Sequence, residues 1–146
     1  MSDQHGYMIV SGSPFGWKSV VVMGVFAGAL QAEGMNFGEV SYRSKADNSM
    51  QSAMFYAPKP GEPVPLVVAL HTWSGDFRQE HHKPIREWCM KKGWAYIHPD
   101  FRGPARRPEA TGSDLVVGDI VSAVDYAKGV AKIQSNAVFL VGTSGG

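Results

Sequence analysis

The sequence predicts an α/β fold, in which a mostly parallel β-sheet begins with an antiparallel hairpin and carries helices on both faces. Three observations lead to this prediction. Two β-prone runs flank a short polar stretch near residue 44. Three short apolar runs follow, and segments with helical periodicity separate them. Because strands that alternate with helices form parallel sheets, this order predicts right-handed strand–helix–strand units.

The predicted hairpin comes first. The runs Glu39 to Arg43 and Gln51 to Ala57 are β-prone, and the polar residues 44–49 between them favour a turn. Prolines at positions 58, 60, 63 and 65 then make a stiff connection that does not fit inside a sheet. The hairpin is therefore expected to end before the first parallel strand.

Three apolar runs are the predicted parallel strands. Leu66 to Leu70 is continuously apolar, which is typical of a central strand buried on both faces. The other two runs are Trp94 to Ile97 and Ala137 to Val141. The last of them leads directly into a glycine-rich turn at residues 142–146.

Two helices are predicted between these strands. The first covers residues 83–92, with Pro84 in its first turn and Gly93 as its C-terminal cap. His81 and His82 precede it and are expected to face solvent. The second covers residues 114–132, with Ser113 or Asp114 as its N-cap. Its predicted apolar stripe consists of Val117, Ile120, Val121, Val124 and Ala127.

Composition limits the classes of function. The chain has 146 residues, of which 44% are hydrophobic, and this suits one domain with a sizeable core. A formal net charge of +1, with both signs spread along the chain, gives no reason to expect a nucleic-acid partner. Cys89 is the single cysteine, so no disulfide forms within the chain, and packing is its expected role.

Residues 1–32 resemble a targeting segment. Lys18 precedes an apolar run that ends in small residues near Ala32, a pattern typical of a secretory signal. The run is too short to span a bilayer. This pattern favours a secreted or periplasmic protein whose folded domain covers residues 33–146. The alternative is a buried strand or helix of a cytoplasmic protein.

The glycine-rich turn carries the candidate chemistry. Residues 142–146 match G-x-S-x-G, in which the serine lies on a sharp strand-to-helix turn with its hydroxyl exposed. Ser144 is therefore the candidate nucleophile. Gly142 and Gly146 are expected to leave room for neighbouring strands, and the N–H of Gly145 is expected to stabilise an oxyanion. A phosphate-binding loop would need a lysine after the glycines, which this turn lacks.

Taken together, these segments resemble the α/β-hydrolase superfamily. The resemblance covers residues 37–146 and rests on the hairpin and on four sequence stretches: LVVALHTWSGD, YIHPDFRG, a D-I-x-x-A-x-x-Y helix and FLVGTSGG. The most similar branch is the prolyl oligopeptidase-like one, which also contains esterases. The resemblance implies an α/β-hydrolase fold of which this chain is the front, incomplete part, ending at the nucleophile turn.

The resemblance also implies roles for a second loop. In such enzymes the other oxyanion donor follows the central strand, which here places the backbone N–H of Trp73 in that role. Thr72 replaces the usual glycine before it. His71 is expected to support this loop rather than act as a base, because the family orders its triad as serine, acid and then histidine. His98, Asp100, Arg102 and Gly103 match a loop that is mainly structural in such enzymes.

The implied function is acyl transfer by a serine hydrolase. The expected substrates are small-molecule esters, including carbohydrate-linked ones, and the alternative is peptide bonds cleaved by a prolyl oligopeptidase-type peptidase. No cofactor is expected, and His81 and His82 lack a third ligand for a metal site. With no acid and base after Ser144, this chain is expected to be a truncated form and to be inactive alone. Two further alternatives are a non-catalytic α/β binding module and a structural surface component.

Overall fold

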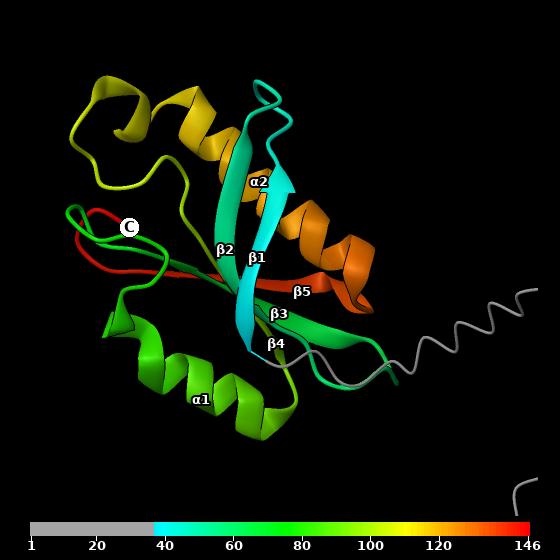
Figure 1. The fold of residues 1–146 in the computed structure, drawn as a ribbon. Helices are drawn as coiled ribbons and strands as arrows, with labels where there is room; N and C mark the ends of the chain where they lie inside the picture. Colours follow the sequence, from blue (N-terminus) through cyan, green and yellow to red (C-terminus); the bar gives the residue numbers. More distant parts are fainter. Residues whose placement is uncertain (1–36) are drawn as a thin grey trace, which may run out of the picture. The chain divides into compact units, whose positions relative to one another are not determined.

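The computed structural model describes residues 37–146, which form a five-stranded mixed sheet with two α-helices (Figure 1). The prediction of a targeting segment in residues 1–32 lies outside these residues and stays a prediction. The strand order is β1-β2-β4-β3-β5. In chain order the elements are β1 (Gly38–Arg43), β2 (Met50–Tyr56), β3 (Val64–Leu70), η1 (Glu80–His82), α1 (Lys83–Lys92), β4 (Ala95–Pro99), η2 (Pro108–Ala110), α2 (Asp114–Val130) and β5 (Ile133–Gly142).

The predicted hairpin is confirmed. β1 pairs antiparallel with β2, and the turn between them is closed by a 2.8 Å bond from Ser44 N to Ser49 O. Asn48 adopts a left-handed conformation in this turn, which asparagine tolerates better than most residues. β2 also pairs antiparallel with β4, whereas β3 pairs parallel with both β4 and β5. The hairpin thus joins a parallel core of three strands.

Helices cover both faces of the sheet, as predicted. Figure 1 shows α1 and α2 on opposite sides of the strands. Leu66 and Val68 of β3 belong to the core cluster that includes residues of α2. Val67 and Ala69 pack on the other face with Cys89 of α1. Successive side chains of a strand point to opposite faces, so the continuous apolar run of β3 is needed to fill two cores.

Local signals placed both ends of α1 and the start of α2 correctly, whereas α2 ends at Val130, two residues before the predicted end. The hydroxyl of Ser113 accepts a 3.3 Å bond from the N–H of Val116, which makes it the N-cap of α2. Gly93 ends α1 with φ 68°, a left-handed conformation that glycine adopts without a steric cost. Pro84 lies in the first turn of α1, where its missing N–H is harmless. No helix in the part that the structure describes has the length and apolar character needed to cross a membrane.

The predicted apolar stripe of α2 was wrong in part. Ala127 is buried, but Val117 and Val121 are 56% and 52% exposed. The helix instead buries Asp119 and Ser122 against the rest of the domain. Asp119 pairs with Arg102, and the hydroxyl of Ser122 accepts from the N–H of Lys45. The inward face of α2 thus combines these paired polar groups with apolar residues, including Ile120 and Val124 of the predicted stripe, which pack against the core.

The prediction for His82 was also wrong. His81 is exposed, but His82 is only 3% exposed, and its Nε2 lies 2.9 Å from the carbonyl oxygen of Leu70. This contact attaches the start of α1 to the carboxyl end of β3. A backbone carbonyl that ends a buried strand needs a donor, and His82 supplies it.

Candidate active site

Three loops meet at one edge of the sheet. β3, β4 and β5 run parallel, so their carboxyl ends lie at the same edge, which is where open α/β sheets bind ligands. The N–H of Ala105, in the loop after β4, donates a 2.8 Å bond to the carbonyl of Trp73, in the loop after β3. Figure 1 shows the end of the chain beside this same loop. The candidate residues from distant parts of the sequence are thus brought together.

The turn at Ser144 has the backbone of a strained nucleophile turn. Ser144 is exposed and has φ 60°, in the left-handed region that L-residues other than glycine and asparagine rarely adopt. The N–H of Gly146 donates a 3.2 Å bond to the carbonyl of Thr143 and closes the turn. Strain of this kind is concentrated at functional sites, where the surrounding structure holds it in place.

The two outer glycines are required sterically. A Cβ at Gly142 would overlap the backbone of Gly146. A Cβ at Gly146 would lie 2.6 Å from the carbonyl oxygen of Leu70 and 2.7 Å from that of His71. Both distances are far below ordinary van der Waals contact, and the neighbouring atoms are backbone. Gly142 is thus required by the tightness of the turn itself, and Gly146 by its close approach to the end of β3.

Gly145 and Trp73, the two predicted oxyanion donors, lie against each other. An ideal Cβ at Gly145 would be 3.0 Å from both the backbone nitrogen and the Cα of Trp73. The indole of Trp73 is 53% exposed, and it is the backbone of this residue that lies against the serine turn. The structure brings together the serine turn and the backbone of this one residue of the other loop.

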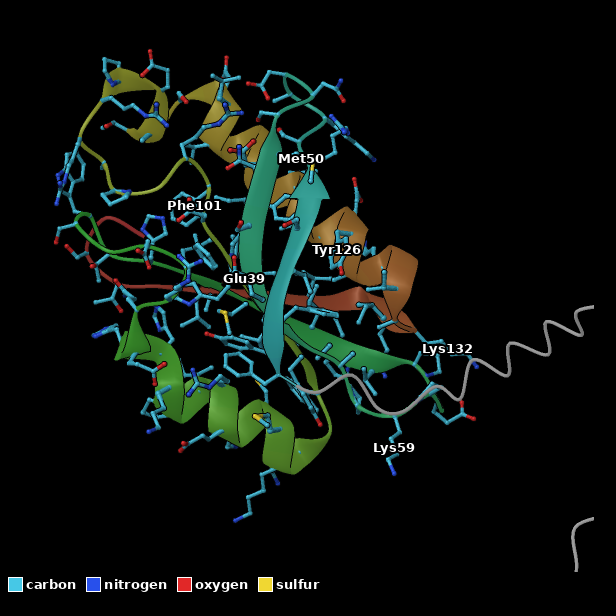
Figure 2. The ribbon with its side chains drawn as sticks, viewed as in Figure 1. Glu39, Met50, Lys59, Phe101, Tyr126 and Lys132 are labelled. Atoms are coloured by element: carbon cyan, nitrogen blue, oxygen red, sulfur yellow. The ribbon has the colours of Figure 1, made fainter. Side chains whose placement is uncertain are left out.

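His71 lies buried between two loops. Its ring is 2% exposed and stacks on Phe101 at a centroid distance of 3.8 Å (Phe101 is labelled in Figure 2). Nδ1 lies 2.9 Å from the carbonyl oxygen of Thr72, and Nε2 lies 2.7 Å from that of Asp100. Carbonyl oxygens only accept, so neither nitrogen faces a donor there.

Gln79 braces the loop after β3, a role that the sequence did not suggest. Its Oε1 accepts from the N–H of Thr72 at 3.2 Å and from the Thr72 hydroxyl at 2.9 Å. Gly75 lies so close to the Gln79 side chain that any Cβ there would overlap it. Thr72 therefore replaces the glycine of the family pattern with a residue whose side chain and backbone are both held by one amide.

The loop after β4 is held by one arginine. Arg102 contacts both carboxylate oxygens of buried Asp119, at 2.7 and 3.0 Å, and both of Asp47, at 2.8 and 2.9 Å. We call these three residues the Arg102 clamp. Hydrogen bonds from Arg102 hold the pKa of Asp47 far below its usual range, and the two carboxylates raise that of Arg102. The clamp agrees with the mainly structural role that the sequence predicts for this loop.

A third buried histidine lies beneath the loops. His98 is 2% exposed, and its ring centroid is 5.7 Å from that of His82 and 6.5 Å from that of His71. Burial, followed by the nearby His82 and His71, lowers the pKa of His98 to about 4. The signal for its burial was available in the sequence, because His98 continues the apolar run of a central strand. Within residues 37–146, no group of three metal-ligating side chains is placed to hold an ion.

Comparison with known proteins identifies the fold. The structure is similar to S-formylglutathione hydrolase (FrmB) from Staphylococcus aureus, with a TM-score of 0.60, 17% identity and coverage of 73% of this chain and 47% of that one. The esterase Pf2001 of Pyrococcus furiosus gives a TM-score of 0.59, 20% identity and coverage of 76% and 43%. Est1E from Butyrivibrio proteoclasticus gives a TM-score of 0.58, 22% identity and coverage of 75% of this chain and 42% of that one. No protein-family model and no curated sequence matches the chain.

At these identities the likeness shows the fold alone. The chain has the mixed sheet and flanking helices of the α/β-hydrolase fold found in these hydrolases and esterases, as the sequence predicts. It spans about half or less of the length of each of these three proteins. The prolyl oligopeptidase-like branch is not distinguished by these similarities and stays a prediction.

Proposed function

We propose that the chain is the nucleophile-bearing part of a serine hydrolase that acts by acyl transfer on esters. The observation that carries this proposal is the strained, exposed Ser144, whose neighbour Gly145 lies against the backbone of Trp73. An ordinary glycine-rich turn requires neither a serine in the left-handed backbone conformation nor close contact with a second loop. The esterase names of the structural neighbours favour ester substrates over the peptide alternative.

The proposed chemistry follows from this geometry. The hydroxyl oxygen of Ser144 attacks the carbonyl carbon of the ester, and its proton passes to a general base. The N–H groups of Gly145 and Trp73 stabilise the negative charge on the carbonyl oxygen. Collapse of the tetrahedral intermediate releases the alcohol, which receives the proton, and leaves an acyl-serine. Water then cleaves the acyl-serine by the same steps and restores the serine.

The described histidines do not supply the base. Both ring nitrogens of His71 face backbone carbonyls, and Nε2 of His82 is held by the carbonyl of Leu70. His98 is buried in β4, and His81 is exposed near the start of α1. We propose that the acid and base of the parent enzyme follow the serine, in the order that the family resemblance implies. His71 then supports the two oxyanion loops.

The complete natural gene product that contains this chain provides the test. It is expected to hydrolyse p-nitrophenyl butyrate, and Ser144→Ala is expected to lower kcat/KM by a factor of about 10⁴ or more. Ser135→Ala is the matched control, because Ser135 is an exposed serine of the same β5 strand. Activity that survives Ser144→Ala would contradict the proposal. An inactive but cooperatively folded gene product would favour the binding-module alternative.

The 146-residue chain alone is expected to be catalytically silent. Without a base, the hydroxyl of Ser144 is a weak nucleophile, and oxyanion donors alone leave only a residual effect over water. Release of nitrophenol by the chain should therefore equal that of its Ser144→Ala variant under the same conditions. A rate that exceeds this control and saturates with substrate would show that a base is already present.

A further inference from the structure

A pocket lies on the α1 side of the hairpin, apart from Ser144. Its volume is about 270 Å³, and its lining comes from β1, β2, β4, α1 and the segment that follows β3. Phe37, Met54 and Phe77 supply apolar surface, and Gln79 and His98 supply polar groups. This is just below the range of about 300–1,000 Å³ that is typical of small-molecule pockets, so a small ligand suits it.

Two lining residues each carry a buried nitrogen that lacks a hydrogen-bond partner. These are Nε2 of Gln79 and Nε2 of His98, both without a partner among the described residues. The orientation of the Gln79 amide is settled chemically, because the N–H of Thr72 only donates and so requires Oε1 opposite it. Nε2 of Gln79 is therefore a donor that lacks an acceptor. Such groups are costly when buried, so each needs an explanation.

The charges around the pocket are balanced. Arg78 pairs with Glu39 at 2.8 Å, and Arg86 pairs with Glu80 through both guanidinium nitrogens at 3.1 and 3.2 Å. Arg86 also lies over the ring of Phe37, 4.3 Å from its centroid. His98 is uncharged at neutral pH, because burial lowers its pKa to about 4. A charged ligand would lose its hydration there without gaining an unpaired counter-charge.

We propose that this pocket binds a small uncharged molecule with an apolar body and a hydroxyl group. The hydroxyl oxygen accepts from Nε2 of Gln79 or bonds Nε2 of His98, in the second case as donor or acceptor according to the tautomer of the ring. The apolar body lies against Phe37, Met54 and Phe77. A hydroxyl fits both nitrogens because it both donates and accepts.

The site stands independently of the chemistry proposed for Ser144, but it is linked to the loop of Trp73. The amide oxygen of Gln79 accepts from Thr72, the neighbour of Trp73, and the nitrogen of the same amide is the one without a partner. A ligand that bonds this nitrogen polarises the amide and strengthens its bonds to Thr72. Occupancy is therefore expected to be detectable at the Thr72 N–H.

The test is a titration of the isotope-labelled 146-residue chain with three probes of similar size, followed by NMR. Benzyl alcohol is expected to shift the Gln79 side-chain amide, the His98 ring and the Thr72 N–H signals saturably at millimolar concentration. Benzoate and benzylamine present the same ring with a negative or positive charge. Each is expected to bind at least about tenfold more weakly, the equivalent of one lost hydrogen bond.

Gln79→Glu replaces the donor nitrogen by an oxygen and retains an acceptor for Thr72. This variant is expected to weaken benzyl alcohol binding by about tenfold or more, as seen at His98. Gln134→Glu is the matched control, because Gln134 lies on β5 and donates to the Pro63 carbonyl. The proposal is overturned by unsaturable shifts up to about 100 mM alcohol, by tighter binding of either ion, or by equal effects of the two variants. The comparison of probes on the unaltered chain decides the matter even if Gln79→Glu does not fold.

Discussion

Backbone strain in the described residues is concentrated near the carboxyl ends of the parallel strands, where Ser144 lies. Positive φ angles occur at Ser144, Phe101 and Arg102, as well as at Asn48 in the distant hairpin turn. The first three lie in loops that follow β5 and β4. Conformations of this kind cost on the order of 1–3 kcal/mol each, so tightly packed neighbours must hold them. At the residue scale, the close contacts of Gly142 and Gly146 hold Ser144 in its strained conformation.

Gly142→Ala tests this steric requirement. The added Cβ would overlap the backbone of Gly146, so the turn must open and the domain should lose about 1–3 kcal/mol of unfolding free energy. Gly129→Ala is the matched control, because nothing lies within 4 Å of its Cβ position on α2. The unfolding free energy of that variant should be unchanged or higher by up to about 1 kcal/mol, because alanine replaces glycine in a helix. Urea unfolding of both variants measures the difference, and equal losses would contradict the steric account.

The low pKa of His98 makes stability depend on pH. The unfolded chain takes up a proton below its ordinary pKa near 6.5, whereas the folded chain resists protonation down to about 4. More protons bind the unfolded state between these values, so stability should fall as pH drops from 6.5 to 4, by up to about 3 kcal/mol. Above pH 6.5 this penalty is absent.

The variant His98→Asn isolates this contribution. It removes the titrating group, so the difference in unfolding free energy between it and the parent chain should shrink as pH falls through this window. His81→Asn serves as the control, because His81 is exposed. Urea unfolding at pH values from about 4 to 7 gives both curves. A difference that is independent of pH would show that His98 titrates as it does in water.

At the scale of elements, the Arg102 clamp joins three parts of the domain. Asp47 lies in the turn between β1 and β2, Asp119 lies in α2, and Arg102 lies in the loop after β4. The same loop donates from Ala105 to the carbonyl of Trp73. The aromatic ring of Tyr126, labelled in Figure 2, lies 5.7 Å from Phe55 of β2 and packs α2 on the hairpin. The clamp thus combines with apolar packing to position the loop beside the candidate site.

Arg102→Leu should destabilise the domain strongly. It leaves the carboxylate of Asp119, which is 0% exposed, without its partner, and such a loss typically costs about 3 kcal/mol or more. Asp47→Asn should lower the unfolding free energy much less, because Asp47 is exposed and the amide oxygen of asparagine still accepts from Arg102. Thermal unfolding of the two variants compares them. Similar melting temperatures would show that Asp119 contributes no buried charge.

At the scale of the whole described domain, β5 is an edge strand with exposed apolar side chains. It pairs with β3 and with no other strand of residues 37–146. Phe139 and Leu140 are 48% and 60% exposed, although Phe139 stacks on Trp94 at 5.7 Å. An apolar edge with unpaired N–H and C=O groups is a template for pairing with another chain. The isolated chain should therefore self-associate as its concentration rises.

Leu140→Lys should reduce this association, because a charge on an edge strand opposes pairing. Val117→Lys is the control, since Val117 is a similarly exposed apolar residue that lies on α2 and not at the edge. Sedimentation or light scattering over a range of concentrations measures the difference. Equal solubility gains from both substitutions would show that apolar area in general, not the edge, drives association.

The sequence by itself determined the order of the elements and the caps of the helices. It did not determine where the strands begin: β3 includes Pro65, which was expected to lie outside the sheet, and β5 begins at Ile133 and not at Ala137. The hairpin, the alternation of strands with helices, the Ser113 and Gly93 caps and the glycine spacing around Ser144 all depend on residues near one another in the chain. Only the tertiary structure decided which side chains are buried and paired. Asp119 and His82 are buried because partners from distant segments face them, and Val117 is exposed because the side of α2 that carries Asp119, Ala123 and Ala127 turns inward. Such pairings join residues far apart in sequence, so local periodicity carries no record of them.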